Sequence, residues 1–507
     1  MIKNVDSVGG EQMERASGIL LHISSLPGPY GIGSLGRAAY QFVDFLKAAG
    51  QRYWQILPIG PTGFGDSPYQ SGSIHAGNPY FIDLDTLAEE GLLDYWELQE
   101  QGCAEAGRVD YGALYRQRPA LLARAYQRGK EARAGAFAAF RQENPWVEDY
   151  ALFMALKGRY EMQSWIHWPE AVSRREPAAL ERAREELREE ISCIAFGQYL
   201  FYAQWARLRA YAGQQGIRII GDIPIYVPMD SVELWLHPEL FQLDDARRPL
   251  AVAGCPPDGF TEDGQLWGNP LYAWERHKQS GFAWWVQRVR AAARCFDVLR
   301  IDHFRGLESY WAVPYGETTA RNGQWQKGPG LELIEALRRA VPELEFIAED
   351  LGYLTPKVEK LLRDSGLPGM KVLEFAFYGE DSAYLPHNHT ENSVCYTGTH
   401  DNSTLAQWLA EESGDTVRRA ADYLGLNEAE GFVRGMLRGG LSSVSRIFIA
   451  QLQDWLELGG EARMNAPGEL SPRNWSWRLT ELPDGALAAE IFKLTKRYGR
   501  TGDTKHA

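Results

Sequence analysis

The sequence predicts an α/β fold, a (β/α)8 TIM barrel with large insertions between its strands. Two observations predict it. Short apolar runs alternate with helical segments along the 507 residues, and three of these runs, at 298–303, 346–350 and 394–401, each end in a carboxylate. In a (β/α)8 barrel, functional side chains collect at the C-terminal ends of several strands. The three acids are therefore expected at one mouth of the barrel.

Eight apolar runs are candidate barrel strands, because each is short and lies between helical or turn segments. They are 18–23, 53–57 (stopped by Pro58), 217–220, the run that ends at Asp302, the run that ends at Glu349, 371–375, the run that ends near Thr397, and 447–452. The eighth run fits a helix as well as a strand.

Helical segments alternate with these runs. Residues 34–49 form one, with Gly50 as a C-terminal cap, because glycine adopts the left-handed conformation that ends many helices. Residues 191–212 place their large apolar side chains on roughly one helical face, and residues 331–340 lead into the fifth strand.

Uneven spacing of the strands locates the insertions. We expect a single catalytic domain over residues 17–500, between a polar N-terminal tail (1–16) and a C-terminal tail (501–507). Residues 87–190 are rich in Ala, Glu, Arg and Leu and predict a helical insertion. Residues 228–290 mix Pro, Gly and Trp without a period and predict a loop-rich insertion, as is typical of functional loops.

Composition excludes several classes of function. The formal net charge of −14 disfavours nucleic acid and anionic membranes as partners. No apolar run is long enough to span a bilayer, and the N-terminus lacks the apolar core of a signal peptide. The five cysteines are odd in number and widely spaced, which favours reduced thiols in a cytoplasmic compartment. The 17 Trp residues suit both a large core and stacking on sugar rings.

The acids at the strand ends indicate chemistry at a sugar bond, where pairs of carboxylates act. Alternate residues of a strand share a face, so Arg300 points the same way as Asp302 and keeps it ionised, as a nucleophile requires. Glu349 follows an apolar run, and desolvation there would raise its pKa and suit it to donate a proton. A structural ion pair remains the alternative for Arg300 and Asp302, and a structural hydrogen bond is the favoured interpretation of Asp350.

Two further strand ends carry polar groups. His400 and Asp401 follow Gly398 in a turn and could bind sugar hydroxyls. Asp222 ends the third run, and a structural role fits it as well as a sugar contact does. The loops at 65–70, 256–270 and 463–478 mix Gly, Pro, Asn and aromatic residues, and could close over a long substrate and exclude water. Ordinary surface loops with buried Trp anchors are the alternative.

Competing chemistries have little support. No phosphate-binding glycine loop follows a strand, and no Gly-Xaa-Ser-Xaa-Gly motif is present. His387 and His389 lack a third ligand at a convincing spacing, so no metal is expected. No cofactor is expected either.

Taken together, the motifs resemble the amylomaltases, the bacterial 4-alpha-glucanotransferases of the α-amylase clan. The resemblance extends from about Ser17 to the C-terminal end. The motifs stand in the family's order: LLHISSLP at 20–27, WQILP at 54–58, DSPYQ at 66–70, GDIP at 221–224, WGNP at 267–270, RIDH at 300–303, AEDLG at 348–352 and THD at 399–401. The family lacks the C-terminal β-sandwich of many amylases, and none is expected here.

The resemblance implies a role for each matching residue. Asp302 corresponds to the nucleophile, Glu349 to the acid/base and Asp401 to the transition-state stabiliser. The implied substrate-binding residues are Tyr69, Asp222, Trp267, Arg300, His400 and Asn465, of which Trp267 and Asn465 lie on elements that line the acceptor side.

The expected activity is disproportionation of α-1,4-glucans by a retaining mechanism through a covalent glycosyl-enzyme, with cyclic glucans as a further expected product. The donors would be α-1,4-glucans and maltooligosaccharides, and the acceptors glucose or maltooligosaccharides. The alternatives are a hydrolase that uses the same acids and a glucan-binding protein without turnover. The sequence leaves the oligomeric state open.

Overall fold

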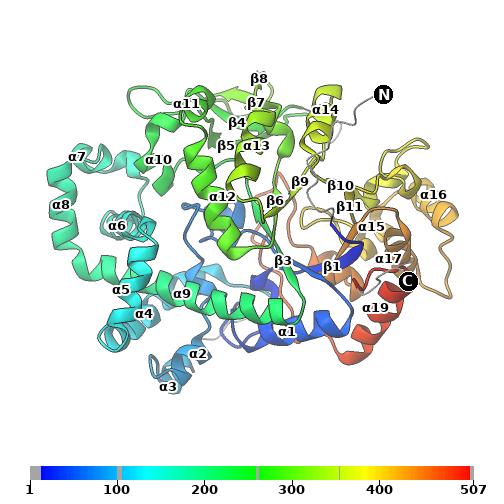
Figure 1. Ribbon diagram of the computed structural model, residues 1–507, viewed down its shortest axis with the longest axis horizontal. Helices are drawn as coiled ribbons and strands as arrows, with labels where there is room; N and C mark the ends of the chain where they lie inside the picture. The colour runs from blue at the N-terminus through cyan, green and yellow to red at the C-terminus, as the bar shows by residue number, and fades with distance from the viewer. Residues whose placement is uncertain (1–12, 100–105, 258–261, 353, 503–507) are drawn as a thin grey trace, which may run out of the picture.

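Eight parallel strands form a nearly closed barrel at the centre of the molecule (Figure 1). The computed structural model describes residues 13–99, 106–257, 262–352 and 354–502. The barrel strands are β1 Ala16–Leu20, β2 Tyr53–Gln55, β3 Arg218–Ile223, β6 Val298–Ile301, β9 Glu345–Ala348, β10 Gly369–Val372, β11 Ser393–Tyr396 and β12 Ile447–Gln451. Their order is β10-β11-β12-β1-β2-β3-β6-β9. The Ala348 amide donates to the Pro368 carbonyl at 2.9 Å, which brings β9 beside β10. The (β/α)8 prediction is confirmed.

All eight predicted runs overlap a barrel strand, but their ends differ from the prediction. Residues 447–451 of the eighth run form β12, and its last residue begins the helix α18 (Leu452–Trp455). The predicted ends of the first and sixth strands are wrong. Residues Ile23–Ser25 and Leu373–Phe377 form the 3₁₀ helices η1 and η8. Their side chains are buried like those of a strand, and an apolar run alone does not distinguish the two conformations.

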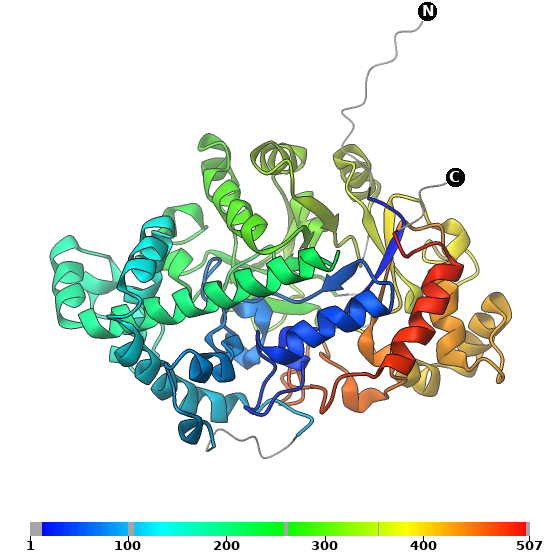
Figure 2. The ribbon, with the colours of Figure 1, turned by 60° about the horizontal axis from the view of Figure 1, so that its bottom comes forward.

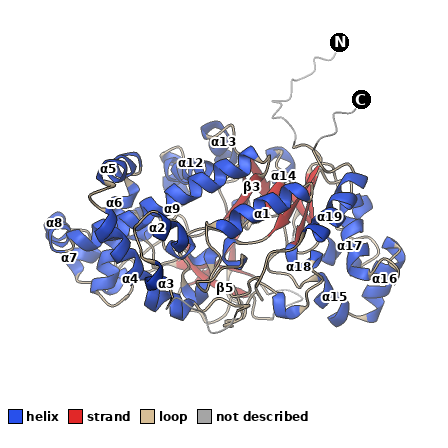
Figure 3. Cartoon of the chain, turned by 90° about the horizontal axis from the view of Figure 1, so that it is seen from below, coloured by secondary structure: helices blue, strands red, loops and turns tan. Residues whose placement is uncertain are grey.

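Helices surround the barrel (Figure 3). The predicted segment 34–49 is α1 (Arg37–Ala48), and Gly50 follows it at φ 68°. The segment 191–212 is the centre of the longer α9 (Arg188–Gln214), and 331–340 is α13 (Leu331–Ala340). The remaining outer helices are α14 Pro356–Ser365, α15 Leu405–Glu411, α16 Gly414–Leu424, α17 Phe432–Ser442 and α19 Gly485–Arg497.

The insertion between β2 and β3 is helical where it is described. It contains α2 Leu84–Glu89, α3 Tyr95–Leu98, α4 Tyr111–Gly129, α5 Ala134–Glu143, α6 Trp146–Arg159, α7 Glu170–Ser173 and α8 Pro177–Glu186. These helices gather at one end of the molecule, on the left in Figure 1. Helix α9 packs against α4, α5 and α6 and also contacts α1 and β3, so one long helix joins the insertion to the barrel.

The second insertion is more regular than the predicted loop-rich segment at 228–290. It holds α10 Val232–Leu236, β4 Ala251–Cys255, β5 Gln265–Pro270, α11 Trp274–Gln279 and α12 Ala283–Cys295. The two strands join β7 Ser309–Pro314 and β8 Gln324–Lys327 in an antiparallel sheet of order β5-β4-β7-β8. Strand β4 has one β-branched residue, so its extended conformation depends on pairing with the distant β7, which a local pattern does not reveal.

The two ends of the described chain meet. Ala16 forms an antiparallel bridge with Thr501. Helix α19 packs against α1, as Figure 2 shows. After β12 the described residues form helices and loops and no further named strand, so they contain no β-sandwich. None of the described helices is long and apolar enough to cross a membrane.

Candidate active site

The predicted acids lie at the carboxyl end of the barrel because each follows a parallel strand. Asp302 comes directly after β6 and Glu349 directly after β9. The register pairs Ile301 with Ala348, so the two acids follow neighbouring positions of adjacent strands. Asp401 lies in the turn after β11. Asp222 is part of β3 and pairs in register with Arg300.

Arg300 joins two of these acids. Its Nη1 donates to Asp302 Oδ1 at 2.9 Å and to Asp222 Oδ2 at 2.6 Å. The Tyr69 hydroxyl donates to the same Asp222 oxygen at 2.8 Å. The side chain of Asp302 is 29% exposed, whereas those of Arg300 and Asp222 are buried at 4% and 0%. Asp302 is therefore the more accessible of the two acids in this group, and a buried cation orients it.

Glu349 has the surroundings of a proton donor. It is buried, and its carboxylate accepts hydrogen bonds from the backbone amides of His303 (2.6 Å) and Leu351 (2.9 Å). Burial raises the pKa of Glu349 to about 8; Arg300 opposes this shift and the charge of Asp302 adds to it. A carboxyl group with that pKa carries a proton at neutral pH.

The neighbouring Asp350 points elsewhere. Its Oδ1 accepts a hydrogen bond from the Met370 amide at 2.6 Å, and the residue is 3% exposed. This is the structural hydrogen bond that the sequence favours for Asp350. Adjacent residues at a strand end face opposite sides, which leaves Glu349 as the acid nearest Asp302 in this motif.

Asp401 is held by the loop at 463–478. Asn465 Nδ2 donates to Asp401 Oδ1 at 2.7 Å, and Arg463 Nη2 donates to the Asp401 carbonyl at 2.8 Å. His400 Nε2 lies 3.4 Å from the same carboxylate oxygen. Since the Asp401 side chain is 42% exposed, its other oxygen is available to a ligand.

Aromatic rings cluster beside these groups. The rings of Tyr69 and His400 stack with centroids 5.0 Å apart and planes 16° apart, and Trp475 lies 5.8 Å from both. Burial lowers the pKa of His400, so its ring is a neutral hydrogen-bonding group. The sequence places Arg463 and Trp475 in a candidate loop. It does not mark either of them as a site residue, because neither belongs to a strand-end motif.

The antiparallel sheet delivers Trp267 to the same mouth. Trp267 lies on β5, and its ring meets His303 edge-on, with centroids 4.7 Å apart and planes 89° apart. His303 follows Asp302 in a left-handed conformation (φ 51°), and its amide donates to Glu349 Oε2 at 2.6 Å. Strand β5 of the second insertion thus contacts, through Trp267, the residue whose amide binds Glu349, which is His303.

The structure brings Asp222, Arg300 and Asp302 into one bonded group with Tyr69, and Asp401 into another with His400 and Asn465. Comparison with known proteins shows the family of the chain. Residues 21–483 match the glycoside hydrolase family 77 model, described as 4-alpha-glucanotransferase.

The chain is 47% identical over 486 residues to the 4-alpha-glucanotransferase of Clostridium butyricum, covering 95% of this chain and 100% of that protein. It is 49% identical over 492 residues to that of Thermus thermophilus, covering 94% and 97% of the two chains. The chain belongs to the 4-alpha-glucanotransferases of glycoside hydrolase family 77.

Solved structures show the same fold. Amylomaltase from Streptococcus agalactiae, solved in complex with acarbose, has a TM-score of 0.93 at 42% identity, covering 96% of this enzyme and 100% of that chain. Amylomaltase from Corynebacterium glutamicum has a TM-score of 0.77 at 19% identity, covering 96% of this enzyme and 75% of that chain, a similarity of fold alone.

The histidine pair considered for a metal is engaged otherwise in this glucanotransferase. His389 contacts Ser445 Oγ at 3.0 Å and the Tyr384 carbonyl at 2.9 Å, and His387 contacts the Tyr423 hydroxyl at 2.8 Å. Among the described residues no group of three or more His, Cys, Asp or Glu could hold a metal ion.

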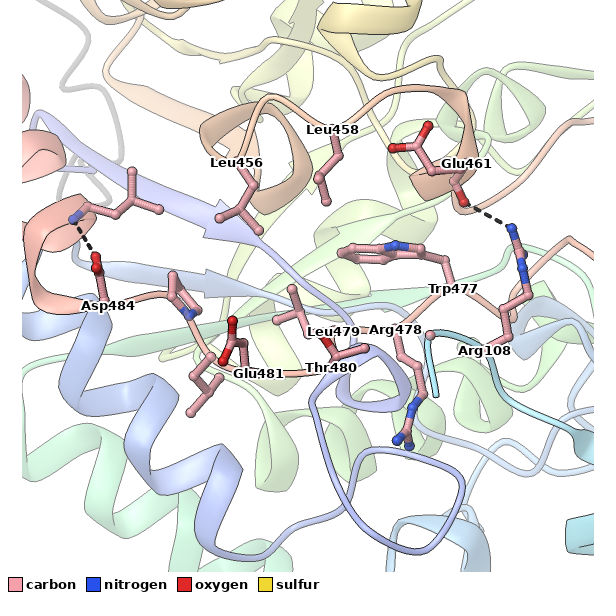
Figure 4. A pocket seen from close by; sticks show the side chains of 14 residues that line it. Arg108, Leu456, Leu458, Glu461, Trp477, Arg478, Leu479, Thr480, Glu481 and Asp484 are labelled. Carbon is pink, nitrogen blue, oxygen red and sulfur yellow. Dashed lines mark hydrogen bonds between the residues drawn. The ribbon is translucent and has the colours of Figure 1, made fainter. Parts of the chain in front are cut away.

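A cavity of about 810 Å³ lies beside the segment 477–484 (Figure 4). Leu456, Leu458 and Trp477 line one part of it, and Asp302, Glu349 and Asp401 are not among its lining residues. Arg108, at its edge, donates to the Glu461 carbonyl at 3.0 Å. The cavity is therefore distinct from the group of carboxylates at the strand ends.

Proposed function

We propose that this 4-alpha-glucanotransferase transfers α-1,4-glucan segments by a retaining double displacement. The single observation that carries the proposal is a buried carboxyl group with a raised pKa, Glu349, together with a partly exposed carboxylate, Asp302, that Arg300 binds at 2.9 Å. Two carboxyl groups whose surroundings give them opposite protonation states are the requirement for this chemistry.

In the first step Asp302 attacks the anomeric carbon while the glycosidic bond breaks. Glu349 gives its proton to the leaving oxygen, and a covalent glycosyl ester forms on Asp302 with inversion. In the second step the 4-hydroxyl of an acceptor sugar attacks the same carbon. Glu349 takes the proton of that hydroxyl, the ester bond breaks, and the second inversion restores the α configuration. A carboxyl separation of about 5 to 5.5 Å is expected for such a pair.

The neighbouring groups suit the sugar on the donor side. Asp401, oriented by Asn465, and the neutral His400 offer an acceptor and a polar ring to sugar hydroxyls, and such bonds strengthen in the oxocarbenium-like transition state. Arg300 donates to Asp302 and fixes its position, and Arg300 is itself held by Asp222, which also accepts from Tyr69.

Trp267 and the loop that holds Asn465 are assigned to the acceptor side. An aromatic ring at the mouth offers an apolar face to a sugar and displaces water. The donors are α-1,4-glucans or maltooligosaccharides, and the acceptors are glucose or maltooligosaccharides. Cyclic glucans form when the 4-hydroxyl of the bound chain itself serves as the acceptor.

A hydrolase would use the same acids with water as the acceptor. Incubation with maltotriose alone separates the possibilities. Glucose together with maltopentaose and longer chains is the expected result. Glucose and maltose without longer products would replace transfer by hydrolysis, and unchanged maltotriose and amylose would favour a glucan-binding protein.

A cytoplasmic location is part of the proposal. It is supported by the absence of disulfides at Cys193, Cys295 and Cys395, since oxidising compartments favour disulfide formation. Alkylation of the thiols in freshly lysed cells, with and without reductant, tests it: equal labelling is expected.

A further inference from the structure

The turn that carries His400 and Asp401 is fixed from beneath by a buried carboxylate. This turn runs from Thr397 to Leu405, where helix α15 begins. Asp454, on α18, bridges its two ends: Oδ2 accepts from Thr397 Oγ1 at 2.6 Å and Oδ1 accepts from the Leu405 amide at 2.7 Å. Asp454 is 0% exposed.

Two longer side chains complete the support. Gln451 Nε2 donates to the Ser403 carbonyl at 3.1 Å. Arg463 donates through Nη2 to the Asp401 carbonyl (2.8 Å) and through Nε to the Asn465 carbonyl (2.8 Å). Since the Asn465 side chain binds Asp401 Oδ1, Arg463 connects the backbone of the turn to the residue that orients its carboxylate.

A second buried carboxyl group, Glu374, lies against the same turn. Glu374 is on η8, directly after β10, and is 3% exposed. Its amide donates to the Thr397 carbonyl at 3.3 Å. A Cβ added to Gly398 would lie 2.9 Å from Glu374 Oε1, so the carboxyl group sits directly beneath the turn. This oxygen has no hydrogen-bond partner among the described residues.

The charged groups around Glu374 do not compensate a negative charge on its carboxyl group in addition to that of Asp454. Asp454 and Glu412 are acids that face it, Tyr378 is a neutral phenol, and Arg463 is the cation that acts on it. Arg463 is already used by the turn. A buried carboxylate without a hydrogen-bond donor is costly, and the group avoids the cost by keeping its proton.

We propose that Glu374 and Asp454 form a buried carboxyl pair that positions the turn bearing His400 and Asp401, with Glu374 protonated in the active enzyme. Asp454 accepts two hydrogen bonds, which lower its pKa against the effect of burial and leave it at about 7, whereas Glu374 Oε1 accepts none. Burial, together with Asp454, raises the pKa of Glu374 well above its usual range. Both are positioning residues, and their effect on rate rests on the proposed function.

The protonation of Glu374 can be measured without substrate. In the infrared difference spectrum of the wild-type enzyme and Glu374→Gln at neutral pH, one carbonyl-stretch band of a protonated carboxyl group is expected in the wild type and lost in the variant, whereas the band of Glu349 is common to both and cancels. Glu412→Gln is the matched control and should leave this band in place. If the wild type shows no protonated-carboxyl band that is lost in Glu374→Gln, the proposed protonation is wrong.

The positioning role is tested by kinetics. Asp454→Asn is expected to lower kcat for maltotriose transfer by about 10- to 100-fold, because a small displacement of Asp401 weakens transition-state binding. The KM should change by less than about threefold, because ground-state contacts remain. Thr397→Val, which loses only the hydroxyl that Asp454 accepts, should lower kcat in the same way, and Thr397→Ser should restore it.

Melting temperatures separate positioning from mere stability. If Thr397→Val and Asp454→Asn melt earlier but the folded enzymes keep the wild-type kcat, the positioning role is refuted. Should Asp454→Asn not fold, the pair Thr397→Val and Thr397→Ser decides the question. A wild type without transfer activity would refute the proposed function, and the infrared band would still decide the state of Glu374.

Discussion

Replacing Glu349 by glutamine removes the proton donor and keeps the shape of the side chain. The structure gives the size of the effect. With a pKa of about 8, the carboxyl group is about 90% protonated at pH 7, whereas a glutamic acid with the usual value of 4.5 would be about 0.3% protonated. Burial thus supplies about 300 times more of the acid form. Loss of general acid catalysis should lower kcat/KM for maltotriose by about 10²- to 10⁴-fold.

The choice of donor tests the assignment. Fluoride leaves without a proton, so Glu349→Gln should still release fluoride from α-maltosyl fluoride in a burst stoichiometric with enzyme. Turnover after the burst should be slow, because no base then activates the acceptor. Asp350→Asn, a change of charge on the opposite side of the strand end, is the matched control and should keep activity on maltotriose once its folding is verified. Wild-type activity of Glu349→Gln on maltotriose, or no burst, would refute the reasoning.

Four further outcomes follow. Asp302→Asn should abolish the fluoride burst and lower kcat at least about 10³-fold, because no nucleophile remains. Asn465→Ala, which removes the 2.7 Å bond to Asp401, should lower kcat about 10- to 100-fold, measured with maltotriose. Trp267→Ala should raise the acceptor KM about 3- to 10-fold and the share of hydrolysis, seen as reducing ends from amylose. The pKa of Glu349 is higher in the folded state than in the unfolded state, so its contribution to the free energy of unfolding is complete below about pH 4.5 and is lost as the pH rises to about 8. Chemical denaturation at several pH values should show this loss for the wild type and not for Glu349→Gln.

The sequence predicts the barrel well because each barrel strand is marked by a pattern of neighbouring residues. A short apolar run that stops at an acid is visible in the residues themselves, and all eight predicted runs overlap strands. The ends of the runs were harder to predict. Leu373–Phe377 is as apolar as a strand, but it turns into a 3₁₀ helix where the chain passes beneath the turn after β11.

Other features depend on pairing between distant parts of the chain. Strand β4 pairs with β7, from which it is separated along the sequence by α11, α12 and β6. The residues of β4 by themselves do not predict a strand. Arg463, Trp475 and Glu374 reach the mouth from loops or from beneath it. No motif marks them, because their partners are carbonyl groups, rings and turns that lie together only in the folded chain.

The sequence by itself determined the barrel, the acids at its strand ends and, through its motifs, the family of the enzyme. Tertiary structure decided how differently the two predicted acids are surrounded. Asp302 and Glu349 both follow apolar runs, but only folding buries Glu349 and supplies it with two backbone amide donors. Asp302 stays partly exposed beside Arg300. The pKa of a carboxyl group depends on its solvation and on charges within a few ångströms, and those neighbours come from separate strands.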